Sequence, residues 1–113
     1  MKMLRTIELT HAVQIDGRGH RSYEFDLRLS DRDHFLREAA RLHCAGTSDR
    51  AAADFLRTKL SRYRAGAWRR TASELRSPHP PEKIETLLWS ILRCRDMVPG
   101  DRLVRDVLAR DRY

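Results

Sequence analysis

The 113-residue sequence contains only two cysteines, five glycines and three lysines, and it has no long run of apolar residues. Cys44 and Cys94 lie far apart, each inside a predicted helix, so we expect two reduced, buried thiols rather than a disulfide framework. No apolar stretch approaches the ~20 residues of a membrane span, and none follows the first basic residues as in a signal peptide. We therefore expect no membrane partner and a cytoplasmic location.

Sequence motifs for catalysis and metal binding are also missing. There is no CxxC or HxxxH spacing, no GxSxG nucleophile elbow and no glycine-rich phosphate loop. His34 and Glu38 stand at i and i+4 of a predicted helix, but on an exposed face such residues usually form an ordinary pair. We expect a protein that is not an enzyme, with no catalytic residue, no metal site and no cofactor.

The charge is strongly one-sided in the middle of the chain. The 23 basic residues, 20 of them Arg, exceed the 16 acidic residues, which gives a net charge of +7. Residues 46–77 hold 8 basic and 3 acidic residues, and so carry +5 of that charge. Such a patch attracts nucleic acid, an acidic protein surface or anionic lipid. A GC-rich genome also produces many arginines, so the location of the charge is more informative than its total.

Two segments near the N-terminus alternate apolar and polar residues, which is typical of half-buried strands. They are residues 3–15, with Ile7, Leu9, Val13 and Ile15, and residues 20–29, with Tyr23, Phe25, Leu27 and Leu29. The glycines of Asp16-Gly17-Arg18-Gly19 suit a chain reversal between them. The sequence therefore predicts an antiparallel hairpin over about residues 3–29.

The rest of the chain shows helical periodicity, and we predict helices over about residues 31–45, 49–70, 82–97 and 101–111. Ser30 and Ser48 are expected N-caps, and Gly46 fits a left-handed residue after the first helix. Gly66 is expected to end or loosen the second helix. The predicted fold class is α+β, a single domain over 1–113 with a long N-terminal antiparallel β-hairpin packed against a bundle of about four α-helices.

The helix predicted over residues 49–70 has an apolar seam bordered by cations. At about 100° per residue, one stripe holds Ala52, Leu56, Leu60, Tyr63 and Ala67. Arg50, Arg57 and Arg64 form a row beside it, about 10 Å apart along the axis. As candidate partner-binding residues we identify Arg50, Arg57, Lys59, Arg62, Arg64, Trp68, Arg69 and Arg70. Trp68 is the better candidate for stacking on a base or sugar, because Tyr63 lies on the apolar seam and is expected in the core.

These patterns favour a small non-enzymatic protein that binds the nucleic-acid phosphate backbone, or a nucleoprotein complex, through this Arg-rich helix. A second hypothesis is a protein-binding inhibitor or adaptor, such as a phage-type counter-defence protein, that docks on an acidic surface of a larger assembly. An edge of the predicted hairpin would also allow a homodimer. A third is a helix-turn-helix around Pro99-Gly100 that presents Arg102, Arg105 and Arg110, although the alternating charges there argue against a strong DNA face.

Overall fold

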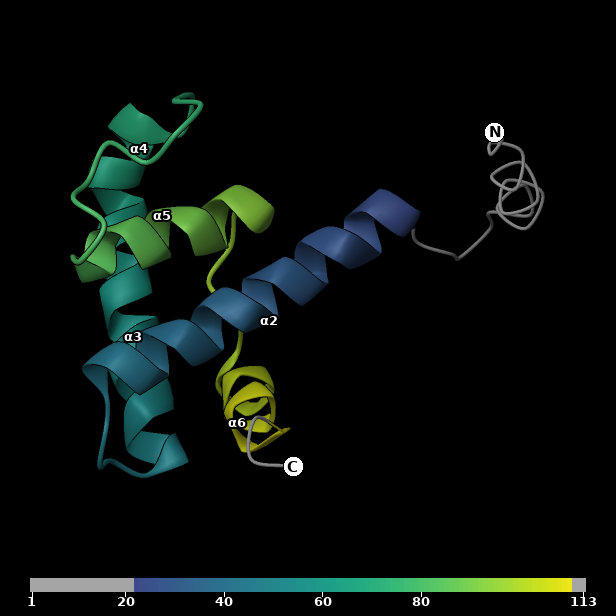
Figure 1. The fold of residues 1–113 in the computed structure, drawn as a ribbon, viewed down its shortest axis with the longest axis vertical. Helices are drawn as coiled ribbons and strands as arrows, with labels where there is room; N and C mark the ends of the chain where they lie inside the picture. Colours follow the sequence, from purple (N-terminus) through teal and green to yellow (C-terminus); the bar gives the residue numbers. More distant parts are fainter. Residues whose placement is uncertain (1–21, 111–113) are drawn as a thin grey trace.

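A computed structural model describes residues 22–110, which form five helices. The helices are α2 (Tyr23–His43), α3 (Asp49–Ala65), α4 (Ala67–Thr71), α5 (Ile84–Cys94) and α6 (Asp101–Arg110). Figure 1 shows α3 with α4 at its end, α2 and α5 crossing it, and α6 near the opposite end of α3. The most extensive contacts join α2 to α5 and α3 to α6.

The predicted α+β fold class is wrong, because the second expected strand is helical and no strand occurs within residues 22–110. Residues 23–29 form the first turns of α2, whose N-cap is Ser22 rather than Ser30. The Ser22 hydroxyl accepts the backbone N–H of Phe25 at 3.0 Å, and Glu24 and Asp26 favour the helix dipole in the first turn. The first expected strand, over residues 3–15, lies outside the described residues.

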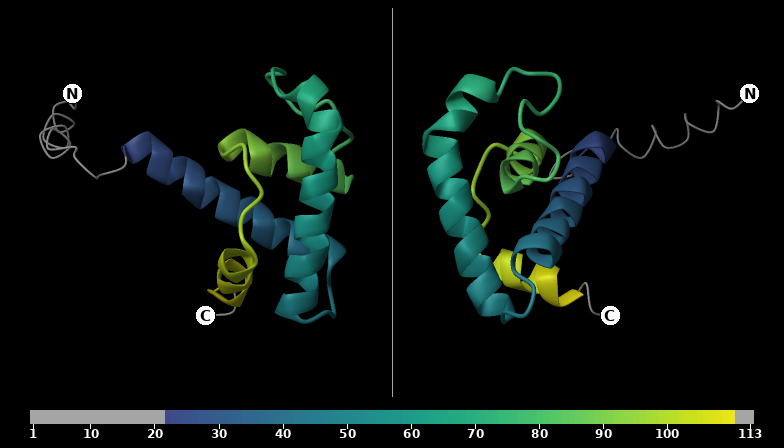
Figure 2. Two further views of the ribbon diagram at one scale, coloured as in Figure 1. Left: turned by 180° about the vertical axis from the view of Figure 1, so that it is seen from behind. Right: turned by 60° about the vertical axis from the view of Figure 1, so that its left-hand side comes forward.

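The alternating pattern at the start of α2 puts apolar residues on more than one side of the helix. Phe25 and Leu29 are half-buried, whereas the exposed fractions of Tyr23 and Leu27 are 62% and 46%. These first turns extend away from the other helices (Figure 2). Apolar and polar residues thus alternate along residues 23–29 although this segment is helical.

The predicted helix boundaries after α2 are closer to the structure. Ser48 caps α3 by accepting the N–H of Ala51 at 3.1 Å, and Gly46 has a φ of 84°, as predicted. The helix predicted over residues 49–70 is broken at Gly66 into α3 and α4. The helices predicted over 82–97 and 101–111 correspond to the shorter α5 and to α6.

The core forms around the apolar face of α3. Leu56 and Leu60 are completely buried, and the seam that includes Ala52 and Tyr63 is covered as predicted, with Ala67 partly buried. The other helices contribute Leu36 and Ala39 from α2, Leu88, Trp89, Ile91 and Leu92 from α5, and Val104, Val107 and Leu108 from α6. Removing this apolar surface from water is the main stabilising contribution.

Arg32 on α2 is the one buried charged side chain among residues 22–110. Its guanidinium donates to Asp33 Oδ1 through Nε at 3.2 Å and Nη2 at 3.0 Å. The other carboxylate oxygen of Asp33 lies 3.5 Å from Arg110 Nη2. This chain of charges connects α2 to α6.

A polar network attaches the loop between α4 and α5 to the end of α3. The Tyr63 hydroxyl lies 2.6 Å from His79 Nε2 and 3.2 Å from Thr71 Oγ1, and the Thr71 hydroxyl donates to the Ala67 carbonyl at 3.0 Å. The Trp89 indole N–H donates to the Thr71 carbonyl at 3.0 Å. A buried hydroxyl thus links three segments of the chain.

We predict that Tyr63→Phe lowers the free energy of unfolding by about 1 to 3 kcal/mol, because it removes the hydroxyl that partners both His79 and Thr71. Urea denaturation followed by circular dichroism measures this loss. Tyr23→Phe is the control, because Tyr23 is 62% exposed, and it should leave the free energy of unfolding unchanged. Equal effects of the two substitutions would contradict the role assigned to the network.

The pKa of Cys94 makes stability depend on pH in the alkaline range. Burial, assisted by the Asp31 carboxylate and opposed by Arg32 and Arg28, raises the pKa of Cys94 to about 11. Burial also raises the pKa values of Cys44 and Tyr63. Because the folded state holds these protons more tightly than the unfolded chain, their contribution is complete below about pH 8.5 and is lost as the pH rises toward 11.

We therefore predict a lower urea midpoint at pH 10.5 than at pH 8, and a smaller difference between the two in Cys94→Ala. The comparison is made within each variant, so any packing defect from the lost sulfur cancels. An undiminished difference in Cys94→Ala would show that this thiol does not account for the alkaline instability.

Candidate nucleic-acid interface

Two arginines of the predicted row, Arg57 and Arg64, contact the segment that connects α5 to α6. Arg57 Nε donates to the carbonyl of the buried Pro99 at 2.9 Å. Arg64 Nε lies 2.8 Å from Asp96 Oδ1, and its Nη2 donates to the Asp96 carbonyl at 3.2 Å. Two members of the predicted binding row therefore hold an internal loop.

Asp96 also accepts a hydrogen bond from the core. The Trp68 indole N–H donates to Asp96 Oδ1 at 3.1 Å, and Trp68 is only 7% exposed. Its ring packs in the apolar core, so its faces are not available for stacking on a base in this conformation. Tyr63 is also buried, at 7% exposure, as its place on the apolar seam predicted.

Two open hollows on the flank of α3 bring several of the predicted residues together. The Asp96 hollow has a volume of about 400 Å³ and is lined by Ser61, Arg64, Ala65, Trp68, Arg69, Asp96 and Val98. The Asp54 hollow has a volume of about 250 Å³ and is lined by Asp54, Arg57, Thr58, Ser61 and Arg62. Ser61 lines both, so the hollows adjoin, and each has two arginines and one aspartate.

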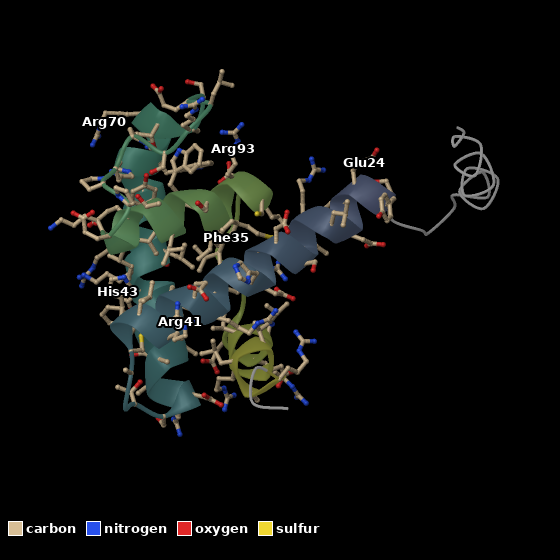
Figure 3. All side chains as sticks on the ribbon, in the orientation of Figure 1. Glu24, Phe35, Arg41, His43, Arg70 and Arg93 are labelled. Atoms are coloured by element: carbon tan, nitrogen blue, oxygen red, sulfur yellow. The ribbon has the colours of Figure 1, made fainter. Side chains whose placement is uncertain are left out.

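Arg62, Arg69 and Arg70 lie close together in the last turn of α3 and in α4 and are free to bind a partner. All three are exposed, and none has a carboxylate within ion-pair distance among residues 22–110. Figure 3 shows the Arg70 side chain pointing outward from α4. Arg62 and Arg69 each line one of the adjoining hollows.

Arg50 and Lys59 lie apart from this group. Arg50 is exposed and lines a different hollow, together with Ser48, Ala51, Asp54 and Asp101. The Lys59 ammonium lies 5.5 Å from the centre of the Phe55 ring, which is a cation–π distance. The eight predicted residues thus do not form one continuous face.

The α6 arginines proposed for a recognition helix are paired with carboxylates. Arg105 Nε lies 3.0 Å from Asp101, and Arg102 Nε lies 4.0 Å from Asp106. Arg110 pairs with Asp33 of α2. These pairs reduce the positive field that α6 presents.

The alternative chemical candidates gain no support within residues 22–110. No cluster of three or more His, Cys, Asp or Glu side chains there could hold a metal ion. The Glu38 carboxylate pairs with Arg41 at 2.7 Å, and this hydrogen bond lowers its pKa. None of the helices described is long and apolar enough to cross a membrane.

Comparison with protein-family models, curated proteins and solved structures finds no match for this chain. Function must therefore be argued from the geometry of the chain itself. Sequence reasoning missed Asp96, which accepts from Arg64 and Trp68, and Ser61, which lines both hollows. An acidic residue just before Pro99-Gly100 was the available signal for Asp96, since a carboxylate there can meet a cation of a packed helix.

We predict that Arg57→Ala lowers the free energy of unfolding by about 1 to 2 kcal/mol, because it leaves the buried Pro99 carbonyl without its donor. Arg62→Ala, on the same helix but exposed and without an ion pair among the described residues, should change it by less than about 0.5 kcal/mol. Thermal and urea denaturation of both variants measure the difference. If the two losses are equal, Arg57 does not stabilise the loop.

Proposed function

We propose that this chain is a small non-enzymatic binding protein that engages the nucleic-acid phosphate backbone through the end of α3 and α4. The observation that carries the proposal is the exposure of Arg62, Arg69 and Arg70, none of which has an ion-pair partner within residues 22–110. Exposed cations in this state attract phosphates and release their counterions, which is the main source of sequence-independent affinity. Arginine also contacts phosphate in a bidentate manner.

The hydrogen bonds that Arg57 and Arg64 make within the protein reduce the number of residues expected to contact nucleic acid. A guanidinium held by Pro99 or Asp96 has fewer donors left for a phosphate. The primary contacts are therefore Arg62, Arg69 and Arg70, and Arg64, whose side chain is 46% exposed, is a secondary contact. We place this activity in the cytoplasm, in keeping with the two free thiols, Cys44 and Cys94.

A protein-binding inhibitor or adaptor is the second candidate, and one observation favours it. Phe55 on α3 is 37% exposed beside Lys59, so an apolar ring and a cation stand together on the surface. Aromatic residues are enriched in protein interfaces, whereas a phosphate backbone makes no use of an isolated phenyl ring. An acidic partner surface with an apolar centre would suit this pair.

We predict that the triple substitution Arg62→Ala, Arg69→Ala and Arg70→Ala strongly weakens binding to nucleic acid while leaving the fold intact. Fluorescence anisotropy with labelled duplex DNA, single-stranded DNA and RNA, recorded over a range of salt concentrations, measures the effect. For duplex DNA, removing three phosphate contacts should also reduce the magnitude of the log-log salt slope by about 2.7.

The matched control is Arg102→Ala, Arg105→Ala and Arg110→Ala, which removes the same charge from α6. It should retain most of the wild-type affinity, because these arginines are already paired. Loss of binding in this control alone would favour the recognition-helix interpretation. Absence of wild-type binding at low salt would overturn the nucleic-acid proposal and favour a search for an acidic protein partner.

A further inference from the structure

The Asp96 hollow gathers hydrogen-bond donors around a single carboxylate. Arg64 Nε and the Trp68 indole N–H converge on Asp96 Oδ1 at 2.8 and 3.1 Å. Arg69 and Ser61 line the same hollow of about 400 Å³. Two cations and one anion leave a net charge of +1 at a site where two donors converge.

The bond between Arg64 and Asp96 is accessible to a competing anion. The side chains of Arg64 and Asp96 are 46% and 60% exposed. Ion pairs exposed to this degree contribute little to stability, because water and salt screen the charges. A ligand with more negative charge and more acceptor oxygens can therefore replace the carboxylate.

We propose that the Asp96 hollow is a phosphate-binding site whose affinity is restrained by Asp96. The carboxylate oxygen occupies the position where a phosphate oxygen would accept from Arg64 and Trp68. Arg69 would contact a second phosphate oxygen, because a tetrahedral oxyanion offers acceptors in several directions. The ligand of this site is a backbone phosphate of nucleic acid. This choice of ligand rests on the proposed function.

Asp96 restrains binding in two ways. Its negative charge repels a phosphate in the hollow, and it engages the Arg64 and Trp68 donors. Asp96→Asn removes the charge but keeps an oxygen acceptor of the same size, so the loop keeps its hydrogen bonds. Removing one negative charge about 5 Å from the ligand should strengthen phosphate binding by about tenfold.

The indole N–H groups of the two tryptophans allow binding and folding to be monitored separately. Trp68 donates its indole N–H to Asp96, whereas Trp89 donates its own to the Thr71 carbonyl. In a proton–nitrogen NMR spectrum of the full chain labelled with nitrogen-15, we predict that inorganic phosphate shifts the Trp68 indole signal in a saturable manner. The Trp89 signal should remain in place and thereby report an intact fold.

The matched variants are Asp96→Asn and Asp106→Asn, which change the net charge equally. Asp96→Asn should bind phosphate about tenfold more tightly, and Asp106→Asn, in an α6 pair, should change the affinity less than about twofold. Arg69→Ala breaks no bond within residues 22–110 and should weaken binding, which tests the site if Asp96→Asn fails to fold. An unmoved Trp68 signal, or equal effects of the two Asn variants, would overturn the proposal.

A single-stranded oligonucleotide titrated in parallel separates the two possible sources of phosphate. A Trp68 shift with both ligands supports a backbone phosphate site. A shift with inorganic phosphate and no response to the oligonucleotide supports the hollow but contradicts the proposed nucleic-acid function. Conversely, oligonucleotide binding that depends on Arg62, Arg69 and Arg70 but never moves Trp68 keeps that function and overturns the site.

Discussion

Burial of the apolar face of α3 is the interaction on which the described structure depends. Ala53, Leu56 and Leu60 of this face have no exposed surface, and α5 and α6 both pack against α3. Since α5 and α6 are consecutive, the segment between them has to run along one flank of α3. The helix capped by Ser48 thus determines where the connection lies.

The path of the segment between α5 and α6 explains why Arg57 and Arg64 make contacts within the protein. A connecting loop exposes carbonyl groups that need donors, and arginines spaced seven residues apart on a helix supply donors along one line. Arg57 binds the carbonyl of Pro99, and Arg64 binds Asp96. The cations beyond the loop, including Arg62 and Arg69, stay available to a partner.

Much of the helical core, but not the fold class, could be predicted from the sequence. The seam of Leu56 and Leu60 and the Ser48 cap depend on neighbours within a few residues, so periodicity and capping chemistry reveal them. Tyr23 to Leu29 alternates like a strand, yet the Ser22 cap and the acidic residues after it favour a helix, and a helix forms. The partners of Arg64 and Trp68 lie about thirty residues away in sequence, where only tertiary structure brings Asp96 to them.

Hydrogen bonds run from His79 through Tyr63 and Thr71 to the Ala67 carbonyl. Their direction is fixed, because each hydroxyl has only one proton to donate. The Ala67 carbonyl can only accept, so Thr71 must donate to it, Tyr63 must then donate to Thr71, and His79 must donate to Tyr63. The loop between α4 and α5 is therefore attached by hydrogen bonds that all run one way, from the His79 imidazole at one end to the Ala67 carbonyl at the other.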